Sequence, residues 1–97
     1  MRTYLAATRD DLERLMAGEA LVCPAFTAAS EDEEDEFDAL ARAATADVVV
    51  VADLPAAEEP VTLDLVQALH VDVDGSGDLA WYATQEADEV LAVLRAR

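Results

Sequence analysis

Four consecutive β-branched residues, Val48-Val49-Val50-Val51, give the strongest structural signal in this chain. Such residues favour strands, and a strand with one face in water alternates apolar and polar side chains. This run does not alternate, so we expect a strand that is covered on both faces and lies in the middle of a sheet. Asp53-Leu54-Pro55 should end the strand, and an exposed loop over 56–60 and a helical turn within 62–66 should follow.

The residues before this strand predict two further strands with a short helix between them. The segment 2–7 contains the Thr, Tyr and Leu residues typical of a strand. Thr8 begins a capping box, and apolar residues at helical spacing follow it, which predicts a helix over 9–17. The segment 21–27 also resembles a strand, but Pro24 lacks an amide donor and makes it an edge strand or an irregular one.

A second helix is predicted from 31 to about 45. Ser30 and Glu33 have the spacing of a capping box at its start. The apolar residues that follow recur at i, i+3, i+4 and i+7 and should face the core, namely Phe37, Leu40, Ala41 and Ala44.

Strict alternation of apolar and polar residues over 68–73 predicts a half-exposed strand. The residues 74–78 have the composition of a turn and 79–83 predicts another strand, so the two strands should form an antiparallel hairpin. A five-residue loop would pair Val71 with Trp81, packing Trp81 into the core. The same register would place His70 opposite Tyr82 on the outer face. These pairings define the register that we expect.

After the hairpin, Thr84 should cap a last helix whose inward-facing residues are Ala87, Val90, Leu91 and Leu94. Repeated strand–helix–strand units normally join parallel strands by crossovers. We therefore expect one α/β domain over residues 1–97, a compact two- or three-layer sandwich. Its mixed sheet should contain about five strands, with a C-terminal antiparallel hairpin and three helices.

The charge balance limits the kinds of partner that the chain can bind. Its 97 residues contain 22 Asp and Glu against 6 Lys and Arg, a formal net charge of −16. Nucleic-acid backbones and anionic lipids require a surface rich in Lys or Arg. We therefore expect no direct binding of nucleic acid and no membrane association, whereas a basic protein partner fits the charge. A large multi-step enzyme does not fit this length.

The cysteine content and the lack of a long apolar run predict a cytoplasmic protein. Cys23 has no second cysteine to pair with and no basic neighbour in the sequence, so it should be a buried, unreactive residue. The apolar run 48–52 is far shorter than the ~20 residues of a membrane helix. The three glycines and the absence of Lys offer no phosphate-binding loop, so no cofactor is expected.

The turn at 72–78 resembles a calcium-binding loop in part. Its oxygen-bearing side chains recur at alternate positions, with Gly75 and Gly77 between them; they are Asp72, Asp74, Ser76 and Asp78. The position that requires a bidentate Glu is occupied by Ala83, and the flanking segments predict strands rather than helices. We favour a plain acidic turn and keep a divalent-cation site as the alternative.

A small hydrolase or metal-dependent enzyme is a second alternative. It would use His70, Asp72 and Tyr82 in acid–base chemistry, provided that they line a common pocket. No activated nucleophile accompanies them, so we favour a cross-strand His–Tyr pair on a sheet face.

The run 31–38 contains seven acids in eight residues. One interpretation is a solvated surface that only keeps the protein in solution. The functional interpretation is a non-enzymatic interaction or regulatory protein that docks a basic partner through these carboxylates. A nucleic-acid mimic that inhibits a DNA- or RNA-binding protein is a further alternative, and it needs Asp72, Asp74 and Asp78 to extend the same face. The candidate partner-binding residues are Glu31, Asp32, Glu33, Glu34, Asp35 and Asp38.

Several short motifs occur in an order that resembles a family of small acidic actinobacterial proteins of unknown function. They are Met1-Arg2-x-Tyr4-Leu5-x-Ala7-Thr8, the acidic run leading into Phe37, His70-Val71-Asp72 and Trp81-Tyr82-Ala83-x-Gln85-Glu86. The chain has Ala6 where that family's pattern has proline, and it is shorter between the helices and around the hairpin. The resemblance implies an actinobacterial cytoplasmic origin and a shared fold, and it supplies no catalytic residues.

Overall fold

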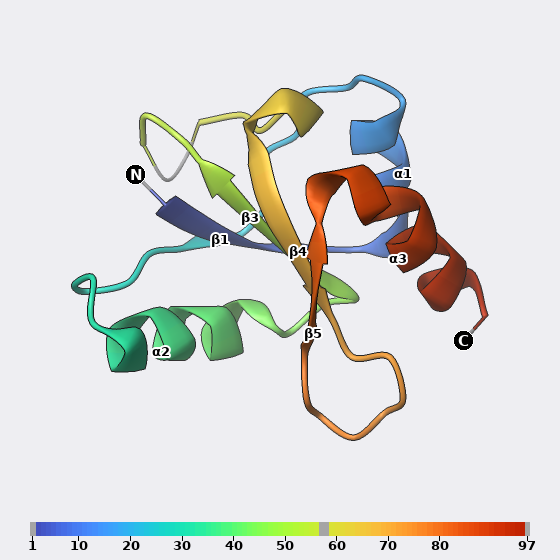
Figure 1. Ribbon diagram of the computed structural model, residues 1–97. Helices are drawn as coiled ribbons and strands as arrows, with labels where there is room; N and C mark the ends of the chain where they lie inside the picture. Colours follow the sequence, from blue (N-terminus) through green and yellow to red (C-terminus); the bar gives the residue numbers. More distant parts are fainter. Residues whose placement is uncertain (1, 57–58, 97) are drawn as a thin grey trace.

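The computed structural model describes residues 2–56 and 59–96, and it contains a five-stranded sheet with helices on both faces (Figure 1). The strands are β1 (Arg2–Ala7), β2 (Ala25–Phe26), β3 (Val48–Asp53), β4 (Val66–Val71) and β5 (Ala80–Ala83). The α-helices are α1 (Arg9–Met16), α2 (Glu33–Ala43) and α3 (Ala87–Arg95), and short 3₁₀ helices occupy Leu63–Leu65 and Thr84–Glu86. The α/β class, the five strands and the three helices are confirmed.

The four valines of β3 lie at the centre of the sheet, as their sequence predicts. The strand order is β2-β1-β3-β4-β5, so β3 has a paired strand on each side. Each residue of Val48–Val51 is at most 5% exposed. Both faces of β3 are therefore covered, which is the condition that a non-alternating apolar run requires.

The strand directions differ from the mixed sheet that we expected. Every strand pairing that the structure describes is antiparallel. The strands β2 and β3, which α2 connects, do run in the same direction, but β1 lies between them and pairs antiparallel with both. The expected crossover therefore spans an intervening strand, and no direct parallel pair forms within the described residues.

Two cores, one on each face of the sheet, make the protein a three-layer sandwich. The larger core packs α1 and α3 against side chains of β1, β3 and β4, and the smaller core packs α2 against the opposite face. The predicted inward-facing residues of the last helix, Ala87, Val90, Leu91 and Leu94, are all buried in the larger core. Cys23 is buried there as well, as expected.

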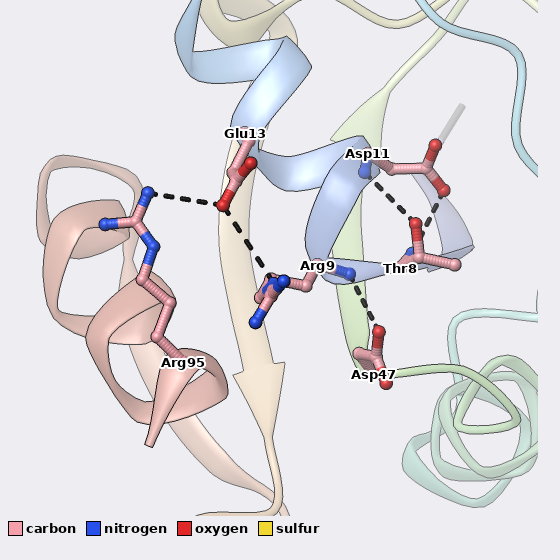
Figure 2. Close-up of polar contacts among 6 residues, drawn as sticks. All are labelled: Thr8, Arg9, Asp11, Glu13, Asp47 and Arg95. Atoms are coloured by element: carbon pink, nitrogen blue, oxygen red, sulfur yellow. Dashed lines mark hydrogen bonds and ion pairs between the residues drawn. The ribbon is translucent and has the colours of Figure 1, made fainter. Parts of the chain in front are cut away.

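Polar contacts fix the start of α1 and join it to α3 (Figure 2). Thr8 Oγ1 accepts a hydrogen bond from the Asp11 amide at 3.1 Å, and the Thr8 amide donates to Asp11 Oδ2 at 3.0 Å, which confirms the capping box. The amide of Arg9 donates to Asp47 Oδ2 at 2.8 Å, which connects the helix to the residue before β3. Glu13 accepts from Arg95 of α3 at 3.2 Å.

The connecting segments follow the sequence in part. Within the predicted strand 21–27, only β2 joins the sheet, while Leu21 forms an isolated bridge with Val61. This irregular pairing agrees with the effect expected of Pro24. The helical turn predicted within 62–66 is the 3₁₀ helix Leu63–Leu65. Residues 57 and 58 of the predicted loop 56–60 lie outside the described residues.

The register of the hairpin is shifted by one residue from the one that we expected. His70 pairs with Trp81, and Leu69 pairs with Tyr82. Because successive side chains of a strand point to opposite faces, this shift exchanges the positions of the two aromatic residues. Trp81 points to the face of α2 and is 61% exposed, whereas Tyr82 packs against the larger core. The prediction that Trp81 packs in the core is wrong.

The shift has a local cause in the loop between β4 and β5. The carboxylate of Asp72 accepts hydrogen bonds from the amides of Gly75 at 2.8 Å and Gly77 at 2.9 Å. Both glycines have positive φ, which glycine adopts without steric cost. Asp72 therefore belongs to the loop, which spans residues 72–79 rather than 74–78.

Alanine substitutions in β5 test this register. We expect Tyr82→Ala to lower the free energy of unfolding by about 2 kcal/mol or more, because the ring packs against the larger core. Trp81→Ala should lower it by less than about 1 kcal/mol, because most of that side chain is exposed. Urea unfolding followed by circular dichroism measures both values. A larger loss for Trp81→Ala than for Tyr82→Ala would support the register that pairs Val71 with Trp81.

Candidate functional site

The predicted partner-binding carboxylates lie at and just before the start of α2. Glu31 and Asp32 precede the helix, and Glu33, Glu34, Asp35 and Asp38 belong to it. All are exposed except Asp35, which is half-buried and accepts a hydrogen bond from Ser30 Oγ. The helix begins at Glu33, so Ser30 lies too early to cap it, and the predicted Ser30–Glu33 capping box is wrong.

Few cations balance these acids. Glu36 pairs with Arg2 of β1 at 2.8 Å, and this contact raises the pKa of the Arg2 guanidinium. Asp38 lies 3.8 Å from Arg42, and both side chains are more than 60% exposed, so this pair is weak. The remaining exposed acids form no ion pair with any described residue; they are Glu31, Asp32, Glu33 and Glu34. The start of α2 is therefore a negative surface with little internal compensation.

The orientation of α2 about its own axis differs from the one that we expected. The residues that rest on the sheet are Ala39 and Ala43, which are fully buried, with Leu40 half-buried beside them. Phe37, predicted to face the core, is 70% exposed. Small alanine side chains let the helix backbone approach the sheet closely, and a Phe at the same contact would hold it away. Glu36 on the inner side reaches Arg2 instead.

A hollow lies between α2 and the end of the 72–79 loop. Its lining includes Phe37 and Leu40 from the helix and Leu79 from the loop, and Asp78 borders it. Ala41 and Ala44 complete the helical side. The residues predicted to face the core thus line a surface hollow with an apolar lining and a carboxylate at its edge.

The half of this sheet face formed by β4 and β5 is not covered by a helix. The helix α2 packs against β1 and β2, while α1 and α3 share the opposite face (Figure 1). A helix is about 10 Å across and strands lie about 4.8 Å apart, so one helix covers about two strands. Another hollow extends from β1 to the open half, and its lining includes Tyr4, His70 and Trp81.

The residues of the enzyme alternative are brought together only in part, because His70 and Asp72 line one hollow and Tyr82 does not. His70 lines the open face beside Trp81, and Tyr82 packs against the larger core on the opposite face. The Asp72 carboxylate is occupied by the loop amides. Burial lowers the pKa of His70, which favours the neutral ring. The three side chains therefore do not form a shared acid–base site.

The calcium-loop alternative also gains no support. The amide of Ser76 donates to Asp74, and the amide of Asp78 donates to Ser76 Oγ, so these side chains hold the loop itself. Within residues 2–56 and 59–96, no three His, Cys, Asp or Glu side chains are grouped so that they could hold a metal ion.

The nucleic-acid-mimic alternative requires one continuous track of carboxylates from α2 to the hairpin. Asp78 does border the same hollow as α2. The surface between them is mainly apolar, however, and includes Phe37, Leu40 and Leu79. A phosphate backbone has no equivalent of this apolar lining, so the arrangement fits a mixed apolar and basic partner better.

Comparison of the chain with protein-family models, curated proteins and solved structures finds no match. The resemblance to small acidic actinobacterial proteins therefore stays a prediction. No helix among the described residues is long and apolar enough to span a membrane.

Sequence patterns missed two surface residues, Phe37 and Trp81. The pattern Asp72-x-x-Gly75 would have indicated the exposed position of Trp81. It is typical of a loop closed by an Asp side chain, and such a loop is longer than the predicted turn. For Phe37 the signal is the pair Ala39 and Ala43, whose spacing of four places small residues along one side of the helix.

Titration of His70, the only histidine, tests the environment of the open face. We expect its pKa in the folded protein to lie below 6.5 because of burial. The unfolded state then binds the proton more readily than the folded state. Lowering the pH from about 6.5 through the lower folded-state pKa therefore reduces the free energy of unfolding. NMR measures the pKa, and His70→Gln should remove this part of the pH dependence. A pKa above 6.5 would mean that Asp47 or Asp72, which line the adjoining hollow, outweighs burial.

Proposed function

We propose that this protein is a non-enzymatic interaction or regulatory protein that docks a basic partner protein through the acidic surface of α2. The observation that carries the proposal is the set of exposed carboxylates at the start of α2 that have no cation beside them among the described residues. They are Glu31, Asp32, Glu33 and Glu34.

The packing of α2 supports this proposal. Ala39 and Ala43 are buried against the sheet, and Glu36 is paired with Arg2, so the helix is attached along one side. The other carboxylates are therefore presented on a fixed scaffold rather than on a loose tail. Fixed charges of one sign attract a partner of opposite charge over a Debye length of about 8 Å at physiological ionic strength.

Stabilisation of the helix alone does not account for the placement of these acids. The macrodipole favours negative side chains in the first turn of a helix by about 0.3–1 kcal/mol each, which explains Glu33, Glu34 and Asp35. Glu31 lies before the N-cap residue Asp32, and Asp38 lies beyond the first turn, where this benefit fades and mutual repulsion remains. A basic partner would relieve that repulsion on binding.

Neutralising the unpaired acids tests the proposal. We expect the combined variant Glu31→Gln, Glu33→Gln and Glu34→Gln to keep its circular dichroism spectrum and to lower partner affinity by about tenfold, since exposed ion pairs contribute about 0.2–1 kcal/mol each. Affinity capture identifies the partner, elution by increasing NaCl tests the electrostatic character, and titration calorimetry with the purified partner gives the affinity.

A matched control removes three negative charges from the other helical layer. Asp10, Asp88 and Glu89 are exposed acids in the first turns of α1 and α3, so their conversion to amides changes the net charge equally. This control should retain most of the affinity. Equal losses in both variants would indicate that only the overall charge matters, and the assignment of the site to α2 would then be wrong.

A further inference from the structure

An apolar strip, interrupted by His70, lies beside the acidic surface of α2. It consists of Phe37 and Leu40 of α2, Leu79 at the end of the loop and Trp81 of β5. Phe37 is 70% exposed and Trp81 is 61% exposed, while Leu40 and Leu79 are half-buried at the edge of the smaller core.

Three neighbouring hollows, which share lining residues, connect these four residues along one surface. Phe37, Leu40 and Leu79 line the first hollow. Leu79 also lines a second hollow together with His70, and His70 lines a third together with Trp81. The apolar strip thus runs from α2 across the loop to the open half of the sheet.

Carboxylates border the apolar strip on both sides. Glu34 lies three residues before Phe37 on the helix, and Asp38 lies four residues after Glu34, so the two carboxylates form a row on the outer side of α2. Asp78 borders the first hollow and Asp72 borders the second, both on the side of the loop. A ligand seated on the strip would therefore meet apolar side chains at its centre and negative charge along both margins.

This charge pattern selects the occupant. A second copy of the chain carries the same −16 and would bring these carboxylates against one another. A ligand with only positive charge would leave Phe37 and Trp81 in water, and exposed apolar surfaces of this kind mark interaction sites. The complementary ligand has an apolar face flanked by Lys or Arg on both sides.

We infer that the apolar strip binds a cationic amphipathic segment of the basic partner. Its apolar side chains pack on Phe37, Leu79 and Trp81. Its Lys or Arg side chains pair with Glu34 and Asp38 on one margin and with Asp78 on the other. The inference rests on the proposed function and adds the chemistry of the partner: an amphipathic pattern rather than positive charge alone.

Three synthetic peptides separate charge from amphipathic pattern. The first is a Leu/Lys peptide of about 18 residues with its leucines at helical spacing. The second has the same composition in an order without that spacing, and the third is oligolysine with the same number of lysines. Trp81 is the only tryptophan, so its fluorescence reports directly on the apolar strip. The first peptide should bind about tenfold more tightly than the second and shift Trp81 emission to shorter wavelength.

Substitutions locate the binding. Phe37→Ser should weaken binding of the amphipathic peptide by about tenfold and leave oligolysine binding unchanged. Val22→Ser is the matched control, because Val22 is 68% exposed and lines none of the three hollows. Trp81→Ala, followed by calorimetry, is an independent second variant that should also weaken the amphipathic peptide.

The possible results separate this inference from the proposed function. Equal binding of the first two peptides, or no effect of both Phe37→Ser and Trp81→Ala, would overturn the inference. The proposed function would still stand if oligolysine binding required Glu31, Glu33 and Glu34. Absence of binding by all three peptides would overturn both. Sedimentation equilibrium adds a separate check, since a dimer dissociated by Phe37→Ser would assign the strip to a second copy and overturn the inference.

Discussion

Burial of β3 on both faces is the constraint on which the rest of the structure depends. A strand of four valines loses about 1.5–3 kcal/mol for each side chain that remains in water, so both faces need a helical layer. Two helices, α1 and α3, cover one face, and α2 alone serves the other. This unequal cover is the origin of the open surface over β4 and β5.

Charged side chains and the packed core are clearly separated in this small fold. Thr3 is the only polar residue among the buried ones that the structure describes. The carboxylates of the described residues are all at the surface or partly exposed, and three of the arginines form ion pairs around α1 and α3 with Glu13 and Glu19. Of the arginines in residues 2–56 and 59–96, this leaves Arg2 and Arg42 around α2, each in one ion pair with an acid of that helix. The negative surface and the incomplete sheet cover therefore occur on the same side.

That coincidence is what favours a binding role over a purely solubilising one. Acids spread for solubility would not need to border apolar side chains. Exposed Phe37 and Trp81 lie in the apolar strip beside the acidic surface, where an apolar group reduces solubility. An interaction surface explains both features with one cause, because its partner would cover the apolar residues and neutralise the acids.

The sequence by itself determined the features that depend on local patterns. The unbroken valines of β3, the capping box at Thr8 and the inward stripe of α3 follow from neighbours within a few residues, and all were predicted. Strand direction, hairpin register and the rotation of α2 were not. Three tertiary contacts decide these features: β1 lies between β2 and β3, Asp72 closes the 72–79 loop, and Ala39 and Ala43 pack on the sheet. The alternatives to each of these contacts have similar local sequence preferences. Only the competition among tertiary contacts for the limited area of the sheet decides between them, and that competition placed Phe37 and Trp81 at the surface.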